Sequence, residues 1–189
     1  MAERTHILCG RGSSITIGNT DLIFGMPVHS SLFLIIAALL LGVVCGMRTF
    51  VAPAILALTL SRSPELVAPA APVHWFTHSV VAIILAIAAI GELIGDKLPQ
   101  TPNRTALAPF VARAVSGGIC GAAIFQLGSM NPWIGAVCGA VGAAASTIGT
   151  FHARRYVGRV TGIRDPYIAV AEDLFAIVIA TSVIATMLV

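Results

Sequence analysis

Long apolar segments separated by short polar ones make up the chain from about residue 30 onward. Five of these segments approach or exceed the roughly 20 residues that a helix needs to cross about 30 Å of hydrocarbon. None of them alternates apolar and polar residues as a barrel strand does. In lipid their backbone N–H and C=O groups can therefore be hydrogen-bonded only within helices. The pattern predicts an all-α, polytopic transmembrane helix bundle with about five spans, over residues 32–52, 78–95, 107–127, 133–151 and 168–188.

The first apolar segment continues to Leu60 and is interrupted by "GMRTFVAP" at 46–53. Pro53 removes a backbone donor and disturbs the preceding turn. Two structures are compatible with this pattern. One is a single long, tilted helix; the other is a helix that breaks near Arg48, followed by a short piece that is re-entrant or lies at the outer surface. Broken helices at membrane depth line a cavity or pack against protein.

The first 28 residues are mixed in character and lack the apolar core and cleavage site of a signal peptide. Met26 stands just before the first apolar segment and is an alternative start to Met1. We predict a flexible tail over residues 1–28 and a single transmembrane helical domain over residues 29–189.

Composition agrees with a membrane protein: 57% of the residues are hydrophobic and 10% are charged, against about 25% charged in soluble domains. The net charge of +3 comes without a basic stripe, so we expect no nucleic-acid partner. The four cysteines form no C-x-x-C pair and are interpreted as small core residues. We expect no metal and no cofactor. The cysteines are Cys9, Cys45, Cys120 and Cys138.

Basic residues are distributed unevenly between the loops. With five spans, eight lysines and arginines fall on the side of the N-terminal tail, whereas Arg62 alone falls on the other. By the positive-inside rule, this bias predicts a multi-pass protein of a bacterial-type inner membrane, with the N-terminus cytoplasmic and the C-terminus outside.

Small residues recur four apart in the third and fourth segments, at Gly117 and Gly121, at Gly135 and Gly139, and at Ala143. At this spacing they share one helix face and let another backbone approach closely. We interpret them as packing faces between helices.

Charged residues within the spans gather at one depth. Counting 1.5 Å per residue from the inner interface places Glu92, Arg113, Glu172 and Asp173 at similar depths, with Asp96 and Lys97 at the interface itself. Ionisable groups here cost on the order of 2–3 kcal/mol unless they are paired or hydrated. One arginine cannot neutralise three acids. We therefore expect one acid to be protonated, bound to a cation, or paired with Lys97 or with Arg154 or Arg155 from the inner loops.

A purely structural interpretation stays open beside this one. Arg113 could pair with Glu172 or Asp173 and fix two spans together, and Glu92 could pair with Lys97. Adjacent Glu172 and Asp173 point about 100° apart on a helix, so one could hold the fold while the other serves chemistry. An unbroken first helix would place Arg48 apart from this cluster, near the outer end, either as an interfacial residue or as an anion-binding group.

Three stretches together resemble a family of small bacterial multi-span proteins known only as a domain of unknown function. They are "GMRTFVAP" (46–53), "GELIGDKLPQTPNR" (91–104) and "RDPYIAVAEDLFAI" (164–177). The resemblance singles out the residues that match the family's elements, and it implies no activity. Asp165 replaces the family's asparagine and its serine is missing near Ala169, which argues against a hydroxyl-dependent role there. The matching residues are Arg48, Pro53, Glu92, Asp96, Lys97, Pro99, Pro166, Glu172 and Asp173.

The leading functional hypothesis is a small transporter or lipid-translocating protein, dimeric because five short helices enclose little room. Glu92, Glu172 and Asp173 would bind a proton or cation, Arg113 would set their charge balance, and Arg48 would meet an anionic group of a small solute or lipid. The first alternative is a non-transporting scaffold or assembly factor in which the cluster locks the helices. The second, weaker alternative is an intramembrane enzyme acting on lipid. No catalytic residue is assigned.

Overall fold

The computed structural model describes residues 22–23, 26–27, 30–69, 71–95, 107–161 and 165–188. Within them the chain is an all-helical bundle of membrane type, as predicted. Two short antiparallel strands, β1 (Leu22–Ile23) and β2 (Met26–Pro27), precede the helices. The remainder of the predicted tail over 1–28 lies outside the described residues, and its flexibility stays a prediction.

Among the described residues, three helices are long and apolar enough to cross a membrane, and three apolar helices are shorter. The long ones are α4 (Leu107–Leu127), α5 (Pro132–Thr161) and α6 (Asp165–Leu188). The shorter ones are α1 (Ser31–Met47), α2 (Val51–Leu60) and α3 (Ser79–Gly95), with two 3₁₀ turns, η1 (Pro64–Leu66) and η2 (His74–Thr77), between α2 and α3. The predicted span at 32–52 is therefore replaced by two separate helices.

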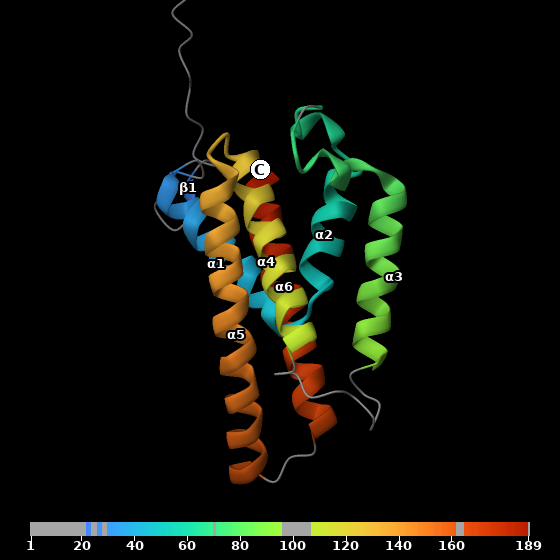
Figure 1. The fold of residues 1–189 in the computed structure, drawn as a ribbon, viewed down its shortest axis with the longest axis vertical. Helices are drawn as coiled ribbons and strands as arrows, with labels where there is room; N and C mark the ends of the chain where they lie inside the picture. The colour runs from blue at the N-terminus through green and yellow to red at the C-terminus, as the bar shows by residue number, and fades with distance from the viewer. Residues whose placement is uncertain are drawn as a thin grey trace, which may run out of the picture.

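Of the two predicted forms of the first apolar segment, the structure has the one in which the helix breaks near Arg48. Arg48 has extended backbone angles (φ −139°, ψ 112°) directly after α1, and α2 begins at Val51. Pro53 is the third residue of α2, where a missing N–H is tolerated because the first turn has no helical acceptor for it. The helices α1 and α2 form a hairpin whose tip, residues 48–50, lies inside the bundle (Figure 1).

The hairpin changes where the ends of the bundle lie. We call the end with the last residue of α3 and the first residues of α4 and α6 the lower end. The first residue of α1 and the end of α6 both lie at the opposite, upper end (Figure 1). Residues 1–21 lie outside the described residues, so the sidedness of the N-terminus stays a prediction. The described bundle begins and ends on the same side, which does not support the prediction that the two termini lie on opposite sides. That prediction assumed one continuous first span, whereas α1 descends and α2 returns.

The tightest packing joins α1, α4 and α5, and it depends on glycine. A Cβ at Gly139 would overlap the carbonyl oxygen of Gly117 on α4, and one at Gly42 on α1 would overlap that of Gly139. Gly121 and Gly135 approach each other in the same way. The predicted role of these glycines in helix packing is confirmed, because only residues without a side chain let the backbones come so close.

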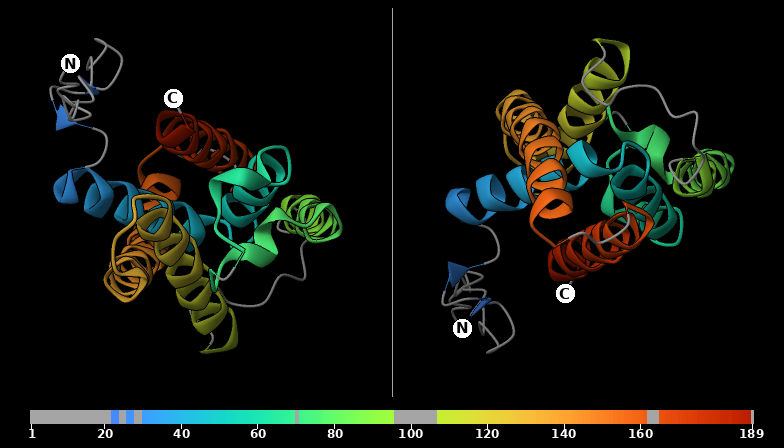
Figure 2. Two further views of the ribbon diagram at one scale, coloured as in Figure 1. Left: turned by 90° about the horizontal axis from the view of Figure 1, so that it is seen from above. Right: turned by 90° about the horizontal axis from the view of Figure 1, so that it is seen from below.

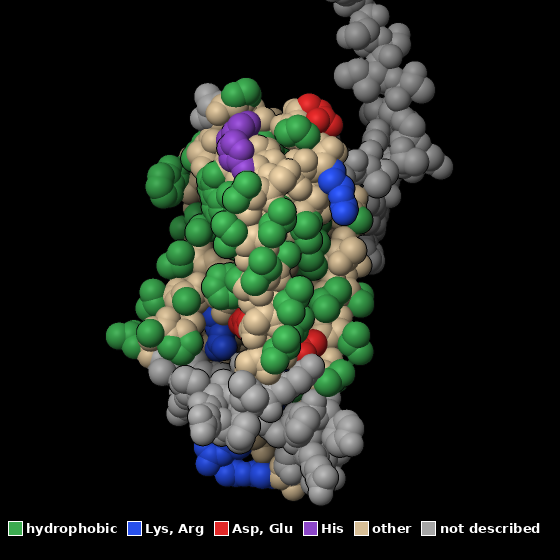
Figure 3. Space-filling view, turned by 90° about the vertical axis from the view of Figure 1, so that its right-hand side faces the viewer, with side chains coloured by type: hydrophobic (Ala, Val, Ile, Leu, Met, Phe, Trp, Pro, Cys, Tyr) green, Lys and Arg blue, Asp and Glu red, His purple; other side chains and the backbone are tan. Residues whose placement is uncertain are grey.

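Helix α3 stands at the periphery of the bundle (Figure 2). It packs chiefly against α2 and η2, and most of its apolar side chains, such as Ile83 and Ile87, point away from the protein and are exposed. Hydrophobic side chains cover the middle of this side of the molecule, whereas acidic and basic ones appear toward its two ends (Figure 3). This distribution fits a helix that faces lipid.

Candidate functional site

The tip of the α1–α2 hairpin frees backbone groups that must find partners elsewhere. Its amide groups are satisfied by α3: the N–H of Thr49 donates to Oε1 of Glu92 at 2.8 Å and the N–H of Phe50 donates to Oε2 at 2.9 Å. These N–H groups form the N-terminus of α2, where unsatisfied donors and the helix dipole favour a negative charge. Glu92 therefore acts as a capping group supplied by a different helix.

The freed carbonyl groups of the tip are satisfied by hydroxyl groups. In a continuous helix the carbonyl of Thr49 would accept from residue 53, but Pro53 has no N–H. The Ser116 hydroxyl of α4 donates to that oxygen instead, at 2.6 Å. The carbonyl of Gly46, whose helical donor would be Phe50, lies 3.2 Å from the Thr147 hydroxyl of α5, which it shares with the nearer Ala143 carbonyl at 2.8 Å. The break is thus held from three other helices.

Arg48 is fully buried at the tip and forms an ion pair with Asp173 of α6. The interpretation that placed Arg48 near the outer end, apart from the acids, is wrong. Because α1 begins at the upper end and descends, its last turn brings Arg48 down to the depth of the acids. Either charge buried here without its partner would cost free energy. The ion pair therefore holds α6 against the hairpin.

Glu172, next to Asp173, faces a different arginine. The guanidinium of Arg154 on α5 donates to both carboxylate oxygens, from Nε at 3.0 Å and from a terminal nitrogen at 2.7 Å. Pairing of an acid with Arg154 was one of the alternatives that the sequence left open. The two adjacent acids diverge as expected for a helix, and each contacts its own arginine.

Bringing Arg48 to this depth changes the charge balance. Arg48 adds a positive charge that the predicted cluster, with Arg113 as the one arginine inside its spans, did not include. Among the described residues, Asp173 pairs with Arg48 and Glu172 pairs with Arg154. Arg113 is buried on α4, three residues before Ser116. Asp96 and Lys97 lie outside the described residues, so their predicted roles stay predictions.

Glu92 differs from the other two acids. It is half-buried, and within the described part of the chain its carboxylate contacts two backbone amides but forms no ion pair with a lysine or arginine. Glu172 and Asp173 each have an arginine. In the part of the chain that the structure describes, the Glu92 carboxylate therefore connects α3 to the tip through backbone amides.

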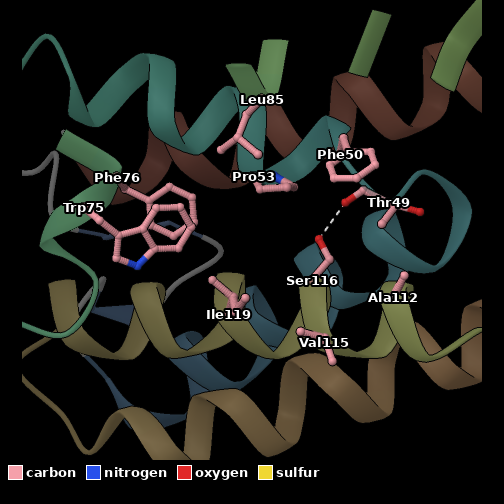
Figure 4. Close-up of a pocket in the computed structure, with 10 residues that line it drawn as sticks. All are labelled: Thr49, Phe50, Pro53, Trp75, Phe76, Leu85, Ala112, Val115, Ser116 and Ile119. Carbon is pink, nitrogen blue, oxygen red and sulfur yellow. Dashed lines mark hydrogen bonds between the residues drawn. The ribbon is translucent and has the colours of Figure 1, made fainter. Parts of the chain in front are cut away.

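A groove of about 270 Å³ separates α2 and α3 from α4 (Figure 4). Trp75 and Phe76 of η2 lie at one end, and Thr49, Phe50 and Ser116 lie at the other. Neither Ser116 nor the groove was predicted from the sequence. The missing donor at Pro53 indicated that the Thr49 carbonyl would need another partner, but nothing in the sequence indicated which hydroxyl would supply it.

A family model described as "Domain of unknown function (DUF4126)" matches residues 35–188, which is most of the chain. The chain therefore belongs to that family, and the resemblance drawn from its three motifs is confirmed. No curated protein and no solved structure matches it.

Proposed function

We propose that this member of the family is a small proton-dependent membrane transporter in which Glu92 is the proton-binding group. The observation that carries the proposal is the pair of hydrogen bonds from the Thr49 and Phe50 amides to the Glu92 carboxylate. Hydrogen bonds to an ionised carboxylate are roughly twice as strong as those between neutral groups. Proton binding removes that charge and weakens the connection between α3 and the hairpin tip.

The arrangement around Glu92 supports a moving part. Helix α3 packs chiefly against α2 and η2, at the edge of the bundle, so its displacement breaks fewer contacts than that of a central helix. Broken helices with ionisable groups at a shared interface are also how several transporter folds build their substrate sites. In the proposed cycle, protonation releases α3 and widens the groove beside α4.

The other two acids take structural roles in this proposal. Their arginine partners support this assignment, since Arg154 binds Glu172 through two nitrogens and Arg48 is buried against Asp173. The hypothesis that all three acids bind a proton or cation is thereby narrowed to Glu92. The basic residues at the lower end of α5, Arg154, Arg155 and Arg159, support a cytoplasmic lower end in a bacterial inner membrane.

Proton flux into liposomes tests the proposal. Purified protein is reconstituted into vesicles that contain a pH-sensitive dye, and the external pH is lowered with a potassium ionophore present to dissipate the membrane potential. We expect proton entry above that of protein-free vesicles, abolished by Glu92→Gln and retained by the matched control Glu172→Gln. Flux equal to protein-free vesicles, or equal flux in Glu92→Gln and the parent, would overturn the proposal.

The scaffold alternative is favoured by one observation, that Glu172 and Asp173 each form an ion pair with an arginine. A structural lock requires balanced charge, whereas a cation site does not. This alternative predicts that the glutamine or asparagine variants of Glu92, Glu172 and Asp173 all lower the thermal unfolding midpoint, and that none changes proton flux.

A homodimer is proposed under either function, and its test is the mass of the detergent-solubilised protein by sedimentation.

A further inference from the structure

We infer that the groove between α3 and α4 binds one hydrocarbon chain of a phospholipid that enters sideways from the bilayer. This inference rests on the proposed function. It adds the class of substrate, which is an amphiphile with a long apolar chain. Binding of the chain can be measured without transport, so the two proposals can fail separately.

The lining of the groove selects an apolar occupant. Its walls are Pro53 of α2, Leu85 of α3, and Val115 and Ile119 of α4, and among the described residues no charged side chain lines it. A charged or strongly polar solute would lose its hydration there without gaining partners. A hydrocarbon chain has no hydration to lose when it enters. It also makes dispersion contacts with the apolar walls, which an empty groove would lack.

The groove is held open by contacts at both ends rather than left by loose packing. At the lower end the tip stands between the two helices, since Thr49 is bound by Glu92 of α3 and by Ser116 of α4. At the other end Trp75 and Phe76 stack with their ring centroids 4.0 Å apart and face the groove (Figure 4). The tip thus stands between α3 and α4 at the lower end, and the two stacked rings bound the groove at the other end.

The groove is open along one side, and that side faces the lipid. Val115 lines the groove, yet 55% of its surface is exposed. Other large apolar side chains of α3 and α4 are exposed as well, including Ile83, Ile87 and Val111, so both helices present an apolar outer surface. An occupant therefore comes from the hydrocarbon layer and not from water, which identifies the chain of a bilayer lipid.

The two ends of the groove differ in polarity, and this difference orients the hydrocarbon chain of the lipid. The hydroxyl of Ser116 at the lower end is already engaged with the Thr49 carbonyl, whereas Trp75 at the upper end is an indole at the level of the loops, where tryptophan marks the interface with headgroups. We place the headgroup beside Trp75, with the chain descending past Ile119 toward Pro53 and Phe50.

Tryptophan fluorescence can detect this chain directly, because the protein has two tryptophans, Trp75 and Trp133. Trp133 is exposed near the start of α5 and does not line this groove, although it lines a second apolar pocket between α4 and α5. In the Trp133→Phe variant Trp75 is the only reporter. Phosphatidylcholine with bromine on its chain, a quencher at short range, is titrated into the full-length protein in detergent. We expect saturable quenching that unbrominated phosphatidylcholine reverses, and stronger quenching when the bromine is nearer the headgroup.

Two variants provide the controls. Trp75→Phe leaves the exposed Trp133 as the reporter, and its quenching should rise with brominated lipid without the saturation expected for Trp75. Ile119→Phe in the Trp133→Phe background fills the groove beside α4, and we expect it to weaken the apparent affinity about tenfold. Its thermal unfolding midpoint is measured to confirm that the variant folds. Equal, non-saturating quenching of Trp75 and Trp133, with no effect of Ile119→Phe, would overturn the inference.

The remaining outcomes are equally decisive. If Trp75 becomes shielded from brominated lipid only as the protein dimerises, a second copy of the chain occupies the groove and the inference is wrong. If saturable lipid binding is found but Glu92-dependent proton flux is not, the binding site stands and the transporter proposal fails. If the flux is found without lipid binding, the transporter stands and its substrate is of another class.

Discussion

The core formed by α1, α4 and α5 and the arm formed by α2 and α3 are assembled in opposite ways. In the core, backbone meets backbone through Gly42, Gly117 and Gly139, with no room for a Cβ. In the arm, a groove separates α3 from α4, and the glycines of α3, Gly91 and Gly95, have open space where a Cβ would be. Since lipid chains are as apolar as the helices, close packing is what drives helix association in a membrane.

The same difference appears in the polar contacts at the tip. The core and α6 hold it by a buried ion pair and by hydroxyl groups, whereas the arm holds it through the Glu92 carboxylate. The tip is thus fixed on one side and connected to α3 by a group that can be neutralised. Helix α3 is therefore the part of the bundle in which movement costs least.

Breaking the ion pair on the fixed side should have the largest effect. Asp173→Asn removes the carboxylate from a fully buried Arg48, and loss of one partner of a buried pair costs about 3–5 kcal/mol. We expect a strongly lowered thermal unfolding midpoint. The double variant Arg48→Met with Asp173→Leu, which removes both charges, should recover most of the loss. A cost below about 1 kcal/mol for Asp173→Asn would contradict the buried pair.

Adding one methyl group within the core should have the next largest effect. Gly139→Ala forces a Cβ against the Gly117 carbonyl, and overpacking of this kind costs about 1–3 kcal/mol. Gly149→Ala is the matched control, because it lies on the same helix and a Cβ there would meet nothing within 4 Å. It should leave the unfolding midpoint nearly unchanged. Equal midpoints for the two variants would show that the core does not depend on glycine contact.

The smallest effect on global stability is expected in the arm. Glu92→Gln keeps one acceptor oxygen but loses the charge and one of two hydrogen bonds, at a cost of about 1 kcal/mol. Hydrogen exchange should accelerate at the Thr49 and Phe50 amides and along α3, while α4 and α5 keep the exchange rates of the parent. Acceleration spread evenly over the whole bundle would mean that core and arm do not differ in mobility.

Much of the fold could be predicted because it depends on local sequence. Apolar length identified the membrane helices, and four-residue spacing identified the packing faces at Gly117 and Gly139. Pro53 showed that the first helix could break. The direction of α1 could not be predicted, since counting charges by loop treats each apolar segment as one crossing, and a hairpin that returns to its own side violates that assumption.

The candidate site shows where local information ends. Sequence alone determined that Glu92, Glu172 and Asp173 lie in apolar helices and require partners, because a charge in lipid is costly. Only the tertiary structure decided that Arg48 pairs with Asp173, Arg154 with Glu172, and two backbone amides with Glu92. The requirement for a partner is a property of each residue, whereas the identity of the partner depends on which helices the glycine contacts bring together.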